Sequence, residues 1–174
     1  MPNNTVYIGI GSNLNNPEQQ VVNGLRALAT LPQTQLTAVS SLYASAPIGP
    51  QDQPPFINAV AQLNTTLAPL ELLDALQALE QDAGRVRTRH WGERTLDLDI
   101  LLFGDLTIDH PRLKVPHPFM RERRFVLEPL FEIFPNAHLP CGTELAADLT
   151  RSLTQDMWHH CTLALDSLGS FTPQ

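Results

Sequence analysis

The order of hydrophobic patterns along the chain predicts an α+β fold with a ferredoxin-like βαββαβ core and an antiparallel sheet. Strand-like and helix-like segments follow one another as strand, helix, strand, strand, helix, strand. The 174 residues, 43% of them hydrophobic, suffice for one domain with its own core. We therefore expect a single domain over residues 1–174, with a core at about 5–134, helices covering one sheet face and a C-terminal structural segment at 135–174.

The first half of the chain supplies three strands and one helix. Residues 5–10 are β-rich and mostly apolar, which is typical of a buried strand. Pro17 opens a helix whose apolar residues keep helical spacing as far as Pro32. Residues 35–43 and 56–65 have the composition of the second and third strands.

The connection over residues 44–55 contains four prolines and is too long for a hairpin turn. Loops of this kind are often functional lids, although a passive linker would use proline as well.

The second half completes the core and adds an extension. Pro69 begins an amphipathic helix that ends near Gly84, and residues 94–103 read as the fourth strand. Further expected elements are a short strand at 106–108, an extended segment at 115–118, a short helix from Met120, and loosely helical patterns at 144–153 and 157–168.

The run Trp158-His159-His160-Cys161 contains potential metal ligands. On the helix expected there, adjacent histidines diverge by about 100°. We therefore do not expect them to share one ion.

Two carboxylates stand at the start of the fourth strand. Asp97 and Asp99 are two residues apart, so they share one face of the strand, with attachment points roughly 6.5 to 7 Å apart. That spacing suits a pair of hard cations, and carboxylate oxygens are ligands that Mg²⁺ prefers. An Asp-x-Asp pair alone would equally suit a solvated strand edge.

The charge distribution favours a small polyanion as ligand. The net charge of −7 argues against general nucleic-acid binding, yet nine Lys and Arg side chains and only six acids lie between Arg85 and Arg124. Arginines around a metal site suit a nucleoside triphosphate, although such a cluster can also coat a solvated loop.

The ends of the chain and its cysteines indicate a cytoplasmic protein. The N-terminus has no signal-peptide pattern, and no apolar run reaches the roughly 20 residues of a membrane span. Cys141 and Cys161 are too few for a disulfide framework.

Several functions remain open on these patterns. A two-metal nucleotidyltransferase or cyclase would also use strand-borne carboxylates. An RNA-recognition sheet would need a basic and aromatic strand motif that residues 5–10 and 95–103 lack. A small-molecule regulatory domain is the other alternative.

Three motifs resemble the 6-hydroxymethyl-7,8-dihydropterin pyrophosphokinase family of folate biosynthesis, and residues 115–127 also fit it. The motifs are Tyr7-Ile8-Gly9-Ile10-Gly11-Ser12-Asn13-Leu14, the run from Pro47 to Asn58, and His90-Trp91-Gly92-Glu93-Arg94-Thr95-Leu96-Asp97-Leu98-Asp99-Ile100. The resemblance covers about residues 7–134. It implies transfer of the diphosphate of ATP to the pterin hydroxymethyl group, with AMP released, by an enzyme that uses two Mg²⁺ ions. We expect the protein to be a monomer.

The same resemblance implies the site residues. Asp97 and Asp99 would hold the metal and, with Arg85 and Arg94, act in catalysis. The implied ATP-binding residues are Gln77, Glu80, Arg87, Trp91, Ile100, Arg112, Lys114, His117 and Arg123. The implied pterin-binding residues are Ser45, Ala46, Ile48, Phe56, Asn58 and Phe125. No nucleic acid or membrane partner is implied.

Overall fold

The computed structural model of the protein describes residues 3–13, 16–46, 55–83, 96–137, 139–140, 144–163, 165 and 168. Its elements in chain order are β1 (Asn4–Ser12), α1 (Pro17–Leu28), β2 (Thr34–Val39), β3 (Leu42–Ser45), β4 (Phe56–Thr65), α2 (Pro69–Ala83), β5 (Asp97–Phe103), β6 (Ile108–His110), β7 (Leu113–Val115), the 3₁₀ helix η1 (Met120–Glu122), α3 (Arg124–Ile133), α4 (Leu145–Ser152) and β8 (Met157–Cys161).

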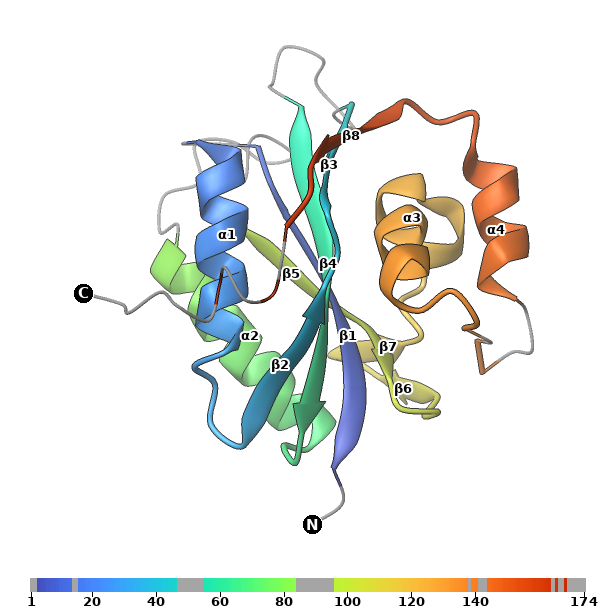
Figure 1. Cartoon of the computed structure of the whole chain (residues 1–174). Helices are drawn as coiled ribbons and strands as arrows, with labels where there is room; N and C mark the ends of the chain where they lie inside the picture. The colour runs from blue at the N-terminus through green and yellow to red at the C-terminus, as the bar shows by residue number, and fades with distance from the viewer. Residues whose placement is uncertain are drawn as a thin grey trace.

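The main sheet is antiparallel and has the strand order β5-β1-β4-β3-β8, with β2 also paired to β4 (Figure 1). The first, third and fourth strands of the predicted core are β1, β4 and β5. The position of the second strand is shared by β2 and β3. This arrangement confirms the ferredoxin-like plan, and β8 extends it at one edge. The short strands β6 and β7 form a separate hairpin beside β5.

The second predicted strand is interrupted at Ser40 and Ser41, so the prediction of one strand over 35–43 was wrong. The Ser40 backbone N–H donates to the Val60 carbonyl at 2.9 Å, and the Ser40 hydroxyl accepts from the Val60 N–H at 2.9 Å. A side-chain oxygen thus replaces a backbone carbonyl in the ladder, and the chain can turn from β2 into β3 without leaving Val60 unsatisfied.

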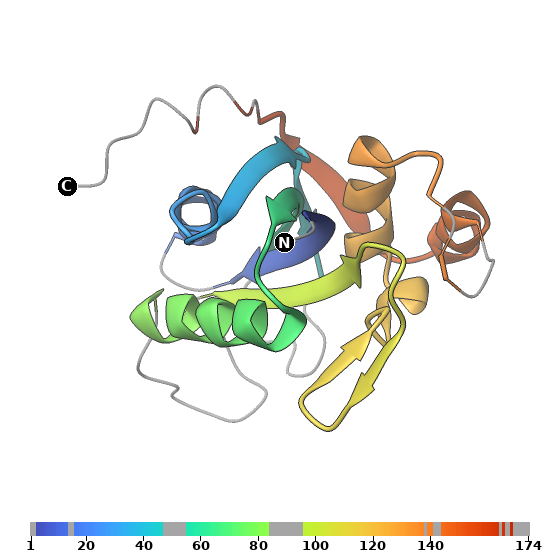
Figure 2. The ribbon, with the colours of Figure 1, turned by 90° about the horizontal axis from the view of Figure 1, so that it is seen from below.

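Helices lie on both faces of the sheet (Figures 1 and 2). Helices α1 and α2 cover one face, as expected, whereas α3 lies against the other, and α4 packs on the outer side of α3. The expectation of a single covered face was therefore wrong. The physical reason is that α3 is strongly apolar along one side and buries that side on β3 and β4.

Alternation along the strands divides the core into two layers. Val6, Ile8 and Ile10 of β1 point to the α1 side and join a cluster that includes Leu25. Tyr7 points to the opposite side, into a second cluster that includes Val60, Leu101 and Leu102 of the sheet and Met120, Leu127 and Leu130 of the η1–α3 segment.

A carboxylate on α3 fastens the turn between β2 and β3. Glu132 accepts hydrogen bonds from the Ser41 N–H (2.9 and 3.0 Å), the Ser41 hydroxyl (2.9 Å) and the Tyr43 hydroxyl (2.7 Å). Burial, reinforced by the bond to Glu132, raises the pKa of Tyr43, so this phenol stays protonated and continues to donate.

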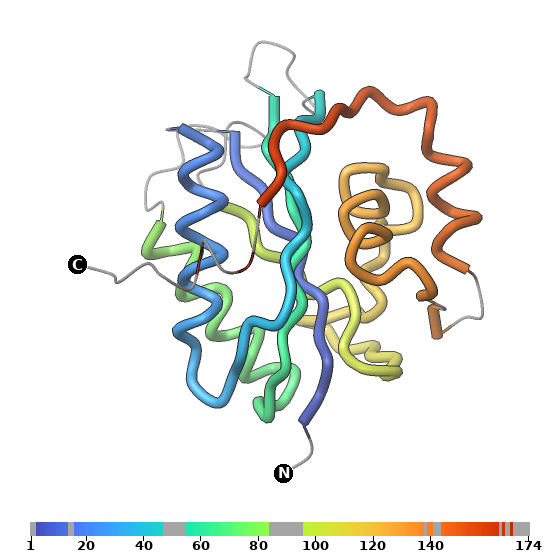
Figure 3. Tube along the Cα trace, viewed as in Figure 1, coloured from blue at the N-terminus to red at the C-terminus, as the bar shows by residue number. Residues whose placement is uncertain are grey.

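The C-terminal segment differs from the sequence expectation. The helical pattern expected at 157–168 begins instead as a strand, β8, which pairs with β3. The tube in Figure 3 shows this segment leaving α4 and returning to the sheet edge. Among the described residues, no helix combines the length and apolar character required to cross a bilayer.

We predict that Glu132→Ala lowers the free energy of unfolding by about 1 to 3 kcal/mol, because three donors on buried residues lose their acceptor. Urea denaturation measures the loss. Asp105→Ala, which removes an exposed acid from the turn after β5, is the control and should change stability by less than about 0.5 kcal/mol. Equal losses in the two variants would contradict this role of Glu132.

Candidate active site

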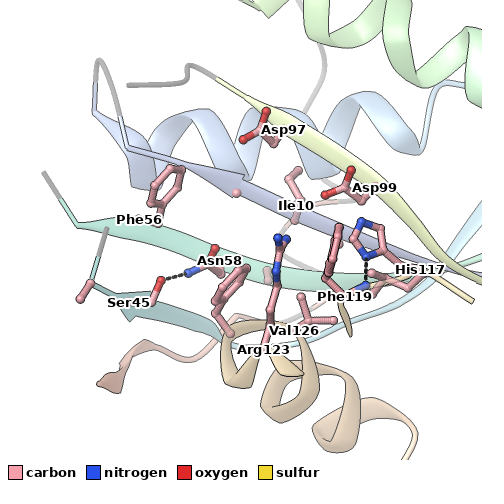
Figure 4. Close-up of a pocket in the computed structure, with 16 residues that line it drawn as sticks. Ile10, Ser45, Phe56, Asn58, Asp97, Asp99, His117, Phe119, Arg123 and Val126 are labelled. Carbon is pink, nitrogen blue, oxygen red and sulfur yellow. Dashed lines mark hydrogen bonds between the residues drawn. The ribbon is translucent and has the colours of Figure 1, made fainter. Parts of the chain in front are cut away.

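A cavity of about 460 Å³ opens on the α3 side of the sheet, beside the part that α3 covers (Figure 4). This volume lies in the range of small-molecule sites. Residues of its wall that lie on strands, or directly after β3 in the case of Ala46, are Gly9, Ile10, Gly11, Ser45, Ala46, Phe56, Asn58, Ala59, Asp97, Asp99 and Leu101. The segment before α3 and the first turn of α3 add His117, Phe119, Arg123, Phe125 and Val126.

The register of three strands creates the hollow. Gly11 of β1 lies opposite Asn58 of β4 on one side and opposite Asp97 of β5 on the other, and Gly9 lies opposite Asp99. Neighbouring strands are about 4.8 Å apart, so the backbones that carry the acids and Asn58 lie roughly 10 Å from each other across a row of glycines. A side chain at Gly11 would fill this gap, because its Cβ would lie 3.0 Å from Asn58 Oδ1.

The acids share one face of β5, as the alternation predicts. Asp97 is half-buried and Asp99 is exposed, while Leu98 between them is buried on the other side. The strand start is held by Glu80 of α2, whose carboxylate accepts the Leu98 N–H at 2.9 Å. Two carboxylates on one cavity wall fit a hard divalent cation such as Mg²⁺.

His117 is placed beside Asp99 by a bulge in β5. The register between β1 and β5 shifts after Ile100, and the Leu101 carbonyl at this point accepts the His117 N–H at 3.0 Å. Burial lowers the pKa of His117, and this effect outweighs the opposing one of Asp99. The imidazole is therefore neutral at pH 7. Its Nδ1 accepts the Phe119 N–H at 3.2 Å, which places the proton on Nε2.

Aromatic rings line the α3 side of the cavity. The Arg123 guanidinium carbon lies 5.2 Å from the centroid of the Phe119 ring and 5.5 Å from that of Phe125. A delocalised cation thus lies over both rings at the cavity wall.

Asn58 and Ser45 form the polar floor. Both are buried, and the Asn58 amide nitrogen donates to the Ser45 hydroxyl at 2.7 Å (Figure 4). This bond fixes the orientation of the amide, with Oδ1 toward Gly11.

The model of the 7,8-dihydro-6-hydroxymethylpterin-pyrophosphokinase (HPPK) family matches residues 7–135. The chain belongs to the HPPK family. Three relatives carry the name 2-amino-4-hydroxy-6-hydroxymethyldihydropteridine pyrophosphokinase. The relative from Pseudomonas aeruginosa is 58% identical over 140 residues, 80% of this chain and 86% of its own length. Those from Haemophilus influenzae and Bacillus subtilis are 54% and 44% identical and cover 84% and 75% of this chain, and 91% and 78% of their own lengths.

A solved structure has the same fold. Plasmodium falciparum HPPK-DHPS, crystallised with pteroate, superposes with a TM-score of 0.70 at 14% identity. The match covers 88% of this chain and 43% of that chain, so this chain spans less than half of it. At such low identity the likeness concerns the fold alone.

The structure brings nine of the residues expected at an HPPK site into one cavity. They are Ser45, Ala46, Phe56, Asn58, Asp97, Asp99, His117, Arg123 and Phe125.

Five other expected residues lie around β5 and outside the wall of this cavity. The Arg112 guanidinium lies 2.5 Å from Asp74 and 3.3 Å from the Gln77 amide oxygen, Lys114 pairs with Asp109, and Glu80 bonds to Leu98. Ile100 pairs with Ile8 inside the sheet. The expected residues Ile48, Arg85, Arg87, Trp91 and Arg94 fall outside the described residues.

Some wall residues were not expected from the sequence. Gly9 and Gly11 belong to a recognised motif, but their value lies in the missing side chains, which only the strand register reveals. Phe119 is half exposed and carries the cation over its ring. In the sequence, Phe119 directly follows the Pro116-His117-Pro118 run, and this position was the signal that could have identified it as a site residue.

We predict that Arg112→Ala changes the free energy of unfolding by less than about 1 kcal/mol. Its ion pair with Asp74 is exposed, with side-chain accessibilities of 46% and 62%. Arg121→Ala is the matched control, because Arg121 pairs with Asp148, which is 1% exposed, and the loss there should be about 1 to 3 kcal/mol. Chemical denaturation of both variants gives the comparison, and a larger loss for Arg112→Ala would assign it a structural role.

Proposed function

We propose that the chain transfers the diphosphate of ATP to the hydroxymethyl group of 6-hydroxymethyl-7,8-dihydropterin and releases AMP, a step of folate biosynthesis. The observation that carries this proposal is the shared cavity. Two carboxylates face a buried amide across the glycines of β1, and aromatic rings flank the space between them.

Asp97 and Asp99 would hold Mg²⁺, which would bind the phosphate oxygens and neutralise their charge. The support is their common face on β5 and their place in the cavity wall. The family uses ATP as co-substrate, and the binding of two ions here is part of the proposal.

Phe56 and Phe125 would stack on the two sides of the pterin ring, and Asn58 would bond to its polar edge, with Ser45, Ala46 and Ile48 completing the pocket. The hydrogen bond between Asn58 and Ser45 supports this role, because a fixed amide is a selective partner for a heterocycle edge. Stacking suits a flat ring.

The remaining side chains would bind ATP. Gln77, Glu80, Arg112 and Lys114 come from α2 and the β6–β7 hairpin, which both flank the edge strand β5. His117 and Arg123 reach the cavity itself and would bind phosphate oxygens. Arg85, Arg87, Trp91, Arg94 and the Ile100 backbone complete the proposed set.

The proposed reaction depends mainly on the positioning of the two substrates and on the stabilisation of negative charge. The pterin hydroxymethyl oxygen forms a bond to the β-phosphorus while the bond from that phosphorus to the AMP oxygen breaks, and the hydroxyl proton passes to solvent. Strands β5 and β4, which carry the acids and Asn58, lie two strand spacings apart, roughly 10 Å, and this separation leaves room to hold the two reactants in line. Arginines would stabilise the charge on the transferred group.

Three further properties belong to this proposal. We infer that the whole chain forms one domain, that it acts as a monomer, and that it works in the cytoplasm. Gel filtration with light scattering tests the monomer directly.

Product analysis tests the function. Incubation with ATP, Mg²⁺ and hydroxymethyl-dihydropterin should yield AMP and the pterin diphosphate in equal amounts. Release of pyrophosphate would instead identify a nucleotidyltransferase, and absence of turnover with retained binding would identify a regulatory domain.

We predict that Asp97→Ala and Asp99→Ala each lower the rate of AMP formation by at least about 100-fold, because each removes a metal ligand. The rate is measured with saturating substrates, and circular dichroism checks that the fold is retained. Asp105→Ala, in the turn after β5, removes an exposed acid and should keep the rate within about twofold. Normal turnover by either cavity variant would refute the metal site.

We predict that Phe125→Ala weakens pterin binding by about 1 to 3 kcal/mol through lost stacking, far more than it weakens ATP binding. Isothermal titration with each ligand measures both effects. Phe131→Ala truncates a ring on the same helix outside the cavity wall and serves as the control. An unchanged pterin affinity in Phe125→Ala would remove this ring from the site.

A further inference from the structure

Three potential metal ligands lie close together in space, and all three are distant in the sequence from Asp97 and Asp99. The His160 Nε2 lies 2.9 Å from one carboxylate oxygen of Glu18, and the Cys161 Sγ lies 3.9 Å from the other. One ligand atom from each residue lies within 4.8 Å of the other two. Glu18 belongs to the first turn of α1, whereas His160 and Cys161 end β8.

A β-bulge explains how two successive strand residues reach the same carboxylate. Neighbours on a regular strand point to opposite faces. In the pairing of β3 with β8, however, Leu42 lies opposite Cys161 and Tyr43 lies opposite His159, which leaves His160 as the extra residue. Such a residue redirects the side chains around it. The sequence predicted a helix here, on which adjacent histidines would diverge and could not share an ion. Residues 157–161 form a strand, so that argument does not apply here.

We propose that Glu18, His160 and Cys161 bind one Zn²⁺ ion. Imidazole, thiolate and carboxylate are the ligands zinc takes in proteins, and the thiolate discriminates against Mg²⁺. Tetrahedral ligands at about 2.0 to 2.3 Å from zinc lie about 3.3 to 3.8 Å from one another. The observed separations need only small side-chain rotations, and water takes the fourth position.

The surroundings permit these rotations. The side chain of Glu18 is 57% exposed and that of His160 is 34% exposed, so both can turn without repacking the core. His159, the other histidine of the run, has other partners. Its ring lies edge-on to the Tyr43 ring, with the two centroids 5.7 Å apart, and its Nε2 lies 3.3 Å from the Thr162 hydroxyl. This histidine therefore provides an internal control.

The ion would fasten the C-terminal segment to the first helix. His160 and Cys161 lie beyond residues 7–135, which the family model matches, so the site is an addition to the family core. Strand β8 also pairs with β3, whose end carries Ser45 of the cavity. Zinc would thus stabilise the sheet edge beside the active site without entering it. Binding requires loss of the Cys161 thiol proton to solvent.

The test uses the full chain with Cys141→Ser, so that Cys161 is the one remaining thiol. After removal of metal by a chelator, Co²⁺ is titrated in the presence of excess Mg²⁺. We expect one equivalent of Co²⁺ to bind with a thiolate-to-cobalt charge-transfer band, and Zn²⁺ to displace it. Zinc at 100 times its Kd should raise the Tm by about 5 to 10 °C.

Ligand variants make the test specific. Cys161→Ser should abolish the charge-transfer band, and Glu18→Gln and His160→Ala should each weaken zinc binding at least about tenfold. His159→Ala and Asp99→Asn should leave it unchanged, which separates this ion from the active-site metal. The proposal is wrong if no band forms, if one equivalent of zinc still binds to Cys161→Ser with unchanged affinity, or if His159→Ala weakens binding as much as His160→Ala.

Discussion

The row of glycines on β1 is the constraint on which the site depends. Gly9 and Gly11 lie between strand β5, which carries the two acids, and strand β4, which carries Asn58. Because glycine has no side chain, a trough remains in the face of the continuous sheet. The β-ladder fixes the two walls at multiples of the interstrand spacing, so the separation of the strands that carry the acids and Asn58 is set by the backbone.

The same strand residues also separate core from site. On the α3 side of the sheet, the apolar residues Tyr7, Val60 and Leu101 lie at one end, where α3 buries them. The polar residues Asn58, Asp97 and Asp99 continue the same faces of β4 and β5 beyond the helix. Helix α3 therefore closes the core and defines the edge of the cavity in a single packing interaction.

Elements outside the family core support this arrangement. Arg121 of η1 pairs with the buried Asp148 of α4, and Gln155 accepts the N–H of Arg124 at the start of α3 (2.9 Å) and donates to the Glu122 carbonyl (2.6 Å). Arg121 and Arg124, which belong to the basic stretch between Arg85 and Arg124, are thus held by contacts with the C-terminal segment. These contacts hold the turn that carries Arg123 and Phe125, two residues of the cavity wall.

The sequence by itself determined the order of the core elements, the common face of Asp97 and Asp99, and the family, because periodicity and local motifs are properties of neighbouring residues. Only the tertiary structure decided which residues meet across elements. It interrupted the second strand at Ser40, placed α3 on the second sheet face, joined Gly11 to Asn58, and turned His160 toward Glu18 through a bulge. Register, bulges and helix packing depend on pairing between distant segments, and no local pattern contains that information.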